Sequence, residues 1–177
     1  MDFELQPTLQ NDVVKIIPLK LEDLEMLYHV ASDPLLWEQH PNKDRYQREV
    51  FEIFFKGAIE SGGAFLVYDA KTNEVIGSSR YYDHNKTKSE ISIGYTFVAK
   101  KCWGKGFNPA LKKLMLDHAF QFVDHVIFHV GAKNIRSQMA MKNIGAKKIG
   151  EQNMNYYGEQ NSLNFLYCID KNDFLAV

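Results

Sequence analysis

The segment WGKGF, residues 103–107, carries two glycines between a run typical of a strand and a run typical of a helix. Glycine adopts backbone angles closed to other residues and lets peptide N–H groups approach a ligand without a Cβ in the way. Asn108 is a favourable N-cap residue, and Pro109 suits the first helical position. Because a helix start favours phosphate or pyrophosphate, we expect an anion site here, to which Lys101 and Lys105 can add positive charge.

The spacing of the glycines separates this anion site from two common nucleotide motifs. A dinucleotide fingerprint would place a third glycine where Pro109 stands, and a P-loop would place Lys-Ser or Lys-Thr after its last glycine. Neither pattern is present. On these residues alone, an ordinary strand-to-helix turn remains the alternative to a ligand site.

A second polar pair, Asn134 and Ser137, stands three residues apart at the start of an expected helix and therefore shares one face of it. An asparagine amide can both accept and donate hydrogen bonds, which suits a ligand that itself carries amides. The alternative for Asn134 is a plain N-cap that needs no ligand.

Glu90 is the candidate general base. It begins an expected strand and shares a face with Ser92 and Gly94. From that face it could remove a proton from a substrate through a water molecule. The alternative is a solvent-facing carboxylate that balances Lys88 or Lys86.

Candidates for contact with a second substrate lie on other segments. Arg80 offers a fixed guanidinium that could bind a carboxylate or phosphate, the alternative being an ion pair with Asp83 or Glu90. Aromatic or imidazole side chains that could wall a pocket, or simply pack in the core, are Trp37, Tyr82, Tyr28, His40, Tyr156 and Tyr157.

The positions of the cysteines and histidines predict neither a nucleophile nor a metal site. Cys102 borders the glycine turn, where a helix start and lysines would lower the pKa of its thiol, but proximity alone does not make it a nucleophile. His29, His118, His125 and His129 show no recognisable metal-ligand spacing, so we expect no metal.

The elements that must position these residues alternate between strand and helix patterns. Strands are expected at 13–19, 64–70, 75–82, 90–98, 126–130, near 147 and at 163–169. The three at 64–70, 75–82 and 90–98 are expected to form an antiparallel meander. Helices are expected from 21 to about 31, at 47–60, at 108–123 and at 135–144. This order predicts an α+β or mixed α/β fold.

Composition bounds the class of protein. A chain of 177 residues with 45% hydrophobic residues can bury one core, and no repeat or linker divides it, so we expect a single domain over 1–177. The 21 basic and 22 acidic residues nearly cancel, which argues against nucleic acid or a membrane as partner. Two cysteines and no leader or spanning segment lead us to expect a cytoplasmic protein.

The segments GYTFVAKKCWGKGFNPALKKLMLDHAF and NIRSQMAMKNIGAKKIGE resemble the GNAT superfamily of acetyltransferases, in the branch of the Rim-type ribosomal-protein N-terminal acetyltransferases. The resemblance covers most of the chain and is strongest over residues 90–151. It implies a mixed, mostly antiparallel sheet of about six to seven strands, splayed in the middle and flanked by about four helices.

The same resemblance implies a function: transfer of an acetyl group from acetyl-CoA to a primary amine, on a protein N-terminus or a small molecule, with a homodimer left open. It places coenzyme A against Phe97, Val98, Cys102, Trp103, Gly104, Lys105, Gly106, Phe107, Asn108, Asn134 and Ser137. It also suggests Ser137 as the group that protonates the departing thiolate, since Met141 stands where many family members have a tyrosine acid.

The expected mechanism is direct attack of a neutral amine on the thioester, with the oxyanion held by backbone N–H groups near Phe97 and Val98. Trp37, Arg80 and Tyr82 are the expected acceptor contacts. A non-catalytic acyl-CoA-binding domain that keeps the glycine turn and Asn134 is the alternative.

Overall fold

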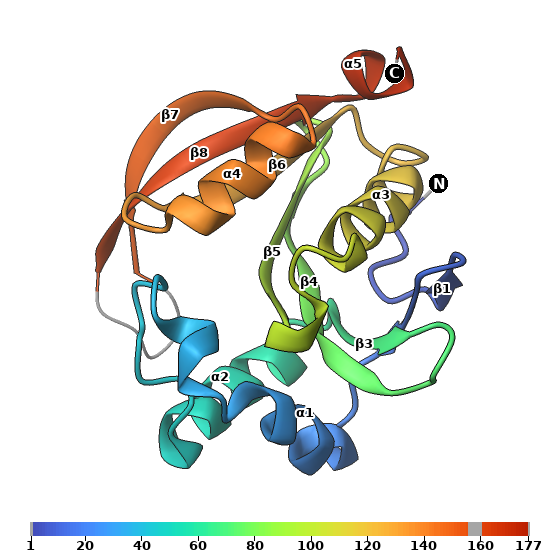
Figure 1. The fold of residues 1–177 in the computed structure, drawn as a ribbon. Coiled ribbons are helices and arrows are strands. Elements are labelled where there is room, and N and C mark those ends of the chain that lie inside the picture. Colours follow the sequence, from blue (N-terminus) through green and yellow to red (C-terminus); the bar gives the residue numbers. More distant parts are fainter. Residues whose placement is uncertain (1, 156–160, 177) are drawn as a thin grey trace.

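The fold is built on one eight-stranded sheet, seen in the computed structural model, which describes residues 2–155 and 161–176 (Figure 1). The strand order is β1-β2-β3-β4-β5-β6-β8-β7. Their bounds are β1 Leu9–Gln10, β2 Val14–Pro18, β3 Ala64–Asp69, β4 Val75–Asn85, β5 Glu90–Val98, β6 His125–Gly131, β7 Lys147–Met154 and β8 Ser162–Asp170.

Neighbouring strands are antiparallel except β5 and β6, which run parallel. The expected mixed, mostly antiparallel sheet is therefore confirmed, with eight strands rather than six to seven. The additional edge strand β1 has two residues, too few to give an alternating hydrophobic pattern.

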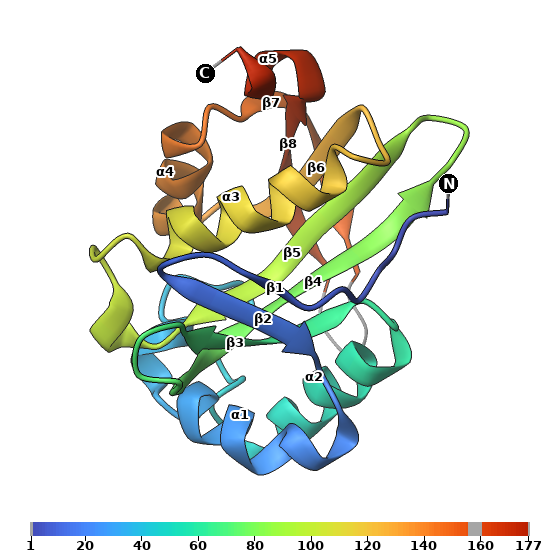
Figure 2. The same ribbon diagram turned by 90° about the vertical axis from the view of Figure 1, so that its right-hand side faces the viewer.

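The described residues form five α-helices rather than four: α1 Leu24–Ala31, α2 Arg48–Glu60, α3 Phe107–Ala119, α4 Ile135–Asn143 and α5 Lys171–Leu175. Short 3₁₀ turns occupy Leu21–Asp23, Pro34–Trp37 and Lys100–Cys102. Figure 2 shows α3 lying across the strands, with α1 and α2 below the sheet edge formed by β2 and β3. In the described part of the chain no helix is long and apolar enough to span a membrane.

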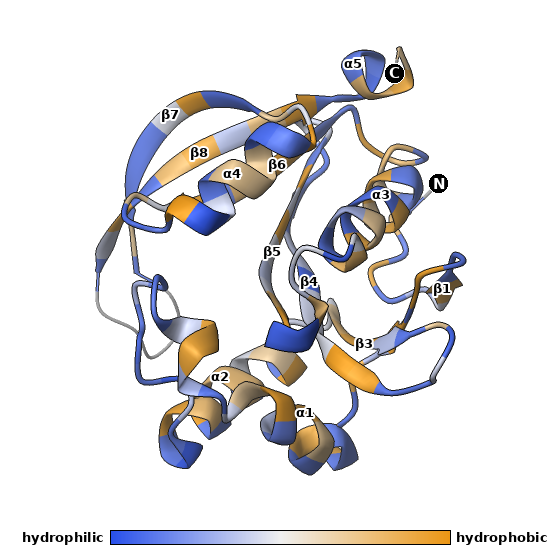
Figure 3. Ribbon diagram, viewed as in Figure 1, coloured by the Kyte–Doolittle hydropathy of each residue, from blue (hydrophilic) through white to orange (hydrophobic). Residues whose placement is uncertain are grey.

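Two hydrophobic cores lie on the two faces of the sheet. The larger one packs α3, through Leu111 and Met115, against strand residues such as Ile91 and Phe128. The smaller one packs α1 and α2 against β3 and the end of β5. Figure 3 shows apolar and polar residues alternating along α1, α2 and α3. The residues that these helices bury lie on the side of the sheet: Leu27 and Ala31 in α1, Phe51 and Ala58 in α2, and Leu111 and Met115 in α3.

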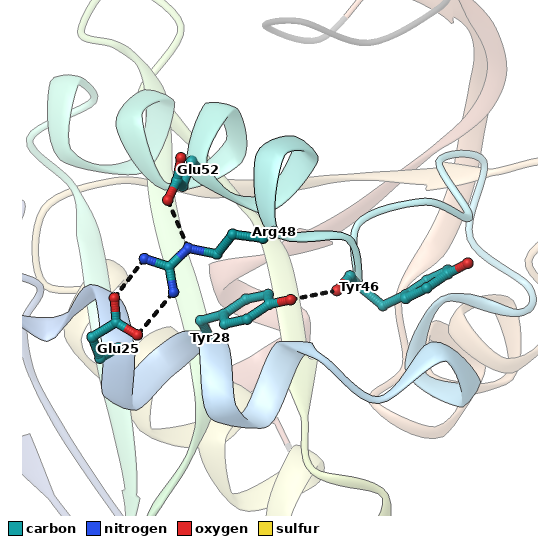
Figure 4. Close-up of polar contacts among 5 residues, drawn as sticks. All are labelled: Glu25, Tyr28, Tyr46, Arg48 and Glu52. Carbon is teal, nitrogen blue, oxygen red and sulfur yellow. Dashed lines mark hydrogen bonds and ion pairs between the residues drawn. The ribbon is translucent and has the colours of Figure 1, made fainter.

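A polar clasp joins α1 to α2 (Figure 4). The guanidinium of Arg48 donates to the Glu25 carboxylate at 2.5 and 2.8 Å and to Glu52 one turn further along α2 at 2.6 Å. The Tyr28 hydroxyl donates to the Tyr46 carbonyl at 3.1 Å, and Arg48 lies 4.9 Å above the Tyr28 ring. These contacts are exposed, so they orient the two helices more than they stabilise the fold.

Helix α3 begins differently from the expectation. Its N-cap is Gly106, in the left-handed region at φ 83°, and its first residue is Phe107. Asn108 is therefore inside the first turn and does not cap the helix, which corrects the assignment made from sequence. The left-handed glycine turns the chain into the helix two residues earlier than an Asn108 cap would, since glycine alone enters this region without strain.

The sheet opens at its centre. Strands β5 and β6 pair only over Glu90–Ser92 and His125–Ile127 and then diverge. The β4–β5 register shifts between Ser78 and Arg80, and Tyr95, within this irregularity, has a φ of 52°. A bulge with a bulky residue in the left-handed region is strained, and it bends β5 away from β6.

Candidate functional site

A cavity of about 650 Å³ lies where β5 and β6 separate. Its walls come from both strands, from the glycine turn and first half of α3, from α4, and from the segment around Trp37 to Arg45. This volume is typical of sites that bind small molecules. All the residues expected to hold coenzyme A line it except Lys105.

The glycine turn forms one end of the cavity. Gly104 and Gly106 have φ values of 70° and 83°, and a Cβ built on either would meet nothing within 4 Å. Asn108, on the next turn, has a buried Oδ1 with no hydrogen-bond partner among the described residues. The open cradle and the unsatisfied oxygen fit a ligand that brings phosphates and hydrogen-bond donors, as coenzyme A does.

The charges at this turn differ from the expectation. Lys101 forms an exposed ion pair with Glu74, and Lys105 does not line the cavity. Among the cations that do line it is Arg136, on the first turn of α4, whose guanidinium lies 3.8 Å from the centre of the Trp103 ring. Partial burial lowers the pKa of Arg136, the sign of a cation held away from bulk water.

Asn134 and Ser137 both line the cavity, as their spacing predicts. The Asn134 side chain caps α4, accepting a hydrogen bond from the Ser137 backbone N–H at 3.1 Å. The capping alternative is thus present in the structure; the cap uses the Asn134 side-chain oxygen, and the residue also lines the cavity. Met141, one turn further along α4, is buried and also lines the cavity.

On the opposite face of β6 from Phe128, a tyrosine–histidine pair faces the cavity. The Tyr82 hydroxyl and His129 Nδ1 are 3.1 Å apart, and the two rings pack edge to face at 5.7 Å. Burial lowers the pKa of His129, and the Asp83 carboxylate only partly opposes that shift. His129 therefore carries an unprotonated imidazole at neutral pH.

Trp37 and His40 form the wall of the cavity nearest α1 and α2. The Trp37 indole donates to the Ala31 carbonyl at 2.8 Å and packs on Phe97 at 5.1 Å. Desolvation, helped by the neighbouring Arg45, keeps the pKa of His40 well below its usual value. Tyr28 lies instead in the helix clasp, and Tyr156 and Tyr157 fall outside the described residues.

Besides Lys105, two further predicted site residues, Arg80 and Glu90, are not brought to the cavity. Arg80 is buried behind Tyr95, with its guanidinium 3.9 Å from the centre of that ring and donating to the Gly57 carbonyl at 3.3 Å. Burial lowers the pKa of Arg80 to about 10. Glu90 lies at the paired end of β5 and β6, where its carboxylate is 3.7 Å from Lys88. Neither lines the cavity.

The cysteines are structural in their surroundings. Cys102 does line the cavity, but it is buried, and burial raises the pKa of its thiol although Lys101 and Lys105 lower it in part. The expected lowering is therefore wrong, because desolvation outweighs the lysines. Cys168 lies elsewhere, and burial with nearby Asp170 raises its pKa to about 12.

One group of possible metal ligands exists in the described part of the chain: His125, Cys168 and Asp170, whose ligand atoms lie within 4.8 Å of one another. Sheet register brings them together, since His125 pairs with Asp170 across β6 and β8. His125 Nδ1 is 2.6 Å from the Asp170 carboxylate, so a hydrogen bond accounts for the contact. None of the three lines the cavity.

Lys112 is a cavity residue that was not predicted from the sequence. Its side chain is 4% exposed and lines the cavity from α3. Its Nζ donates to Thr96 Oγ1 at 2.6 Å and lies 5.6 Å from the centre of the Phe128 ring. A signal was available in the sequence. Lys112 lies three residues before Met115 and four before Leu116, so helical spacing places it on the buried face of α3, whereas Lys113 lies outside that face.

The chain is similar to many solved acetyltransferase structures at low sequence identity. A GCN5-related N-acetyltransferase from Brucella melitensis superposes with a TM-score of 0.83 at 15% identity, covering 97% of this chain and 81% of that one. An acetyltransferase of the GNAT family from Bacillus anthracis gives 0.75 at 17% identity, covering 94% and 99%. These likenesses show the fold.

A third similar structure contains bound ligands. Spermidine N-acetyltransferase from Vibrio cholerae, in complex with CoA and spermine, superposes with a TM-score of 0.70 at 17% identity, covering 93% of this chain and 99% of that one. No curated protein matches the chain in sequence.

A family model gives the stronger result. The model of the acetyltransferase (GNAT) domain matches residues 14–147, well over half of the chain, and this range contains β5, the glycine turn, α3, β6 and α4. Together with the open sheet and its cavity, this match shows that the chain belongs to the GNAT family of acetyltransferases, which use acetyl-CoA as acetyl donor.

Proposed function

We propose that the chain transfers the acetyl group of acetyl-CoA to a primary amine, on a protein N-terminus or a small molecule, by direct attack of the neutral amine on the thioester carbonyl. The observation that carries this proposal is the cavity between the diverging strands β5 and β6, with the glycine turn at one end and an unprotonated imidazole on the other face. Both reactants can meet there without a covalent enzyme intermediate.

The donor would lie along the wall formed by the end of β5 and the start of α3. Backbone N–H groups around Gly104 and Gly106 would hold the pyrophosphate, with Arg136 as the nearby cation. Asn108 Oδ1 and the Asn134 amide suit the amides of the pantetheine arm, which carry matching donors and acceptors. The end of β5 at Phe97 and Val98 pairs with β4 but not with β6, and its side toward β6 would offer backbone groups to the same arm.

Ser137 is the proposed proton donor to the departing thiolate, because it lines the cavity on the same helix turn as Asn134. Met141 stands where many family members have a tyrosine acid, and its buried apolar side chain cannot donate a proton. A thiolate with a pKa near about 8.5 leaves readily, and its protonation accelerates the reaction without being essential.

His129, held by Tyr82, is the proposed proton acceptor for the attacking amine. No Asp or Glu lines the cavity among the described residues, and Glu90 pairs with Lys88 outside it. Because a weak base suffices for an α-amine, whose pKa of about 7.7–8.0 leaves part of it neutral, the pair favours an α-amine over a lysine side chain.

The finer assignment to the Rim-type branch rests on the segment resemblance over residues 90–151, and with it we propose a peptide α-amine as the first acceptor class to test. The likeness to a spermidine N-acetyltransferase motivates polyamines as the second class. We also propose that residues 1–177 act as a single domain, since all eight strands of the described residues belong to one sheet.

The donor site is tested by calorimetric titration with acetyl-CoA. Gly106→Trp should abolish saturable binding, because the indole would occupy the pyrophosphate cradle. Gly62→Trp is the matched control: Gly62 also has a left-handed φ of 63° and open space around it, but it lies outside the cavity. Equal binding by the two variants would refute the cradle, and no binding by wild type would refute the donor assignment.

The transfer step is tested by thiol release from acetyl-CoA with a panel of peptides, amino acids and polyamines. Release that depends on one amine class establishes the acceptor. Tight donor binding without release by any class would instead favour the non-catalytic acyl-CoA-binding alternative, which the methionine at position 141 already motivates.

A further inference from the structure

The most unusual group in the cavity is the amine of Lys112. A lysine side chain is almost never fully buried unless a carboxylate pairs with it, since an ammonium ion carries three donors and a charge that burial penalises. Lys112 has one hydrogen bond, to the neutral Thr96 hydroxyl, and an aromatic ring nearby. Thr96 is in turn bonded to Ser79 at 2.8 Å, so no charge balances the amine through that chain.

No described residue near this amine supplies a negative charge. The cavity lining contains no Asp or Glu among the described residues. The titratable or charged side chains that share it, from β4, β5, β6, α4 and the turns beside α1 and α3, are His40, Arg45, Tyr82, Tyr95, Cys102, His129 and Arg136. Desolvation by burial opposes protonation of Lys112, and the neutral amine is the form that this environment favours.

A neutral primary amine is the same chemical group that the proposed reaction acetylates. Resting on that proposed function, we propose that Lys112 is itself an acetylation site: bound acetyl-CoA transfers its acetyl group to Lys112 Nζ when no external amine occupies the cavity. The Nζ–C bond forms, the C–S bond breaks, and coenzyme A leaves as the thiol with the proton lost by the nitrogen.

The pKa of Lys112 supports this assignment. Desolvation lowers it to about 7, so about half of the molecules carry the neutral amine at that pH. An exposed lysine, with a pKa near about 10.4, is almost entirely charged there. Acetylation removes the ionisable amine altogether and fills part of the cavity, so the modified protein should bind acetyl-CoA more weakly.

Lys113 is a matched internal control. It is the next residue on α3, is exposed, and pairs with Asp117 at 2.9 Å. Wild-type protein incubated with acetyl-CoA and no added amine is digested, and acetylation at the two lysines is quantified by mass spectrometry. We expect at least about tenfold more acetylation at Lys112 than at Lys113 at pH 7, from the difference in neutral amine.

Two further arms show whether the bound donor is responsible. Excess coenzyme A should suppress acetylation of Lys112 and leave that of surface lysines unchanged. The donor-dependent acetylation that coenzyme A suppresses should be lost from the protein in Lys112→Met and retained in Lys113→Met. The readout is on wild-type protein, so the result stands even where Lys112→Met folds poorly.

Three outcomes are distinct. If calorimetry shows acetyl-CoA bound and Lys112 is acetylated no faster than Lys113, this inference fails while the proposed function stands. If Lys112 is acetylated but coenzyme A does not suppress it, the amine reacts with free donor and the inference also fails. If acetyl-CoA does not bind, the proposed function fails and this inference falls with it.

Discussion

The two walls of the cavity differ in the kind of group that they offer to a ligand. The wall of α3 and α4 presents backbone groups, two left-handed glycines and an N-cap, all within residues 104–137. The opposite wall presents side chains from β4, β6 and the segment before α2, which are remote in sequence. A donor common to a whole family can be held by backbone geometry, whereas an acceptor that differs between members needs side chains that vary.

The largest expected effect tests whether the side-chain wall does chemistry. His129→Asn should lower kcat with the best amine of the panel by about a hundredfold, since a positioned general base contributes roughly 10²–10⁴. Donor affinity measured by calorimetry should stay unchanged. A variant that keeps full kcat would show that this wall only binds, and Tyr82→Phe, which removes the hydroxyl beside His129, is the milder companion change.

The pH profile sharpens the same assignment. A base must be unprotonated, and burial lowers the pKa of His129, so kcat/KM should rise most steeply with pH below a pKa under 6.5, then less steeply, and level once the acceptor amine is deprotonated. In His129→Asn this low-pH limb should disappear. A limb that persists unchanged in the variant would assign it to another group.

Lys112→Met should change how stability depends on pH. The folded-state pKa of Lys112 is about 7 and the unfolded value is 10.5, so between these values the unfolded chain binds more protons. Wild-type stability relative to Lys112→Met should therefore rise with pH over this window, by up to about 1.4 kcal/mol per pH unit, and should be lowest below pH 7. Urea unfolding at several pH values measures this, with Lys113→Met as the control that shows no such slope.

A smaller effect is expected at the backbone wall. Ser137→Ala should slow thiol release by about tenfold or less, because a thiolate with a pKa near about 8.5 leaves without full protonation. The loss should be greatest at high pH, where solvent supplies few protons to replace the one that Ser137 relays to the thiolate. Donor binding by the variant should equal that of wild type, as titration would show.

The smallest expected effect concerns the surface lysine at the turn. Lys101→Met should change acetyl-CoA affinity by less than about twofold, because this side chain is exposed and paired with Glu74 outside the cavity. Arg136→Met should weaken binding clearly more. The opposite order would place the donor phosphates over Lys101 and revise the description of this wall.

Local patterns predicted most of the elements. The strand at 90–98 agrees with β5 to the residue, and α2 and α4 begin and end within one residue of their expected bounds. These elements have clear alternation or caps, which depend on neighbours in sequence. The start of α3 was misjudged because Asn108 and Gly106 are both acceptable caps, and the left-handed turn selects between them.

The sequence by itself determined the family, the glycine turn and the helix stripe, because each depends on residues close together in the chain. Only the tertiary structure decided which side chains meet: that Glu90 and Arg80 lie outside the cavity, that His129 meets Tyr82, and that Lys112 is buried without a carboxylate among the described residues. These placements depend on the divergence of β5 and β6, because the burial of a side chain and the charges around it depend on how strands distant in sequence separate.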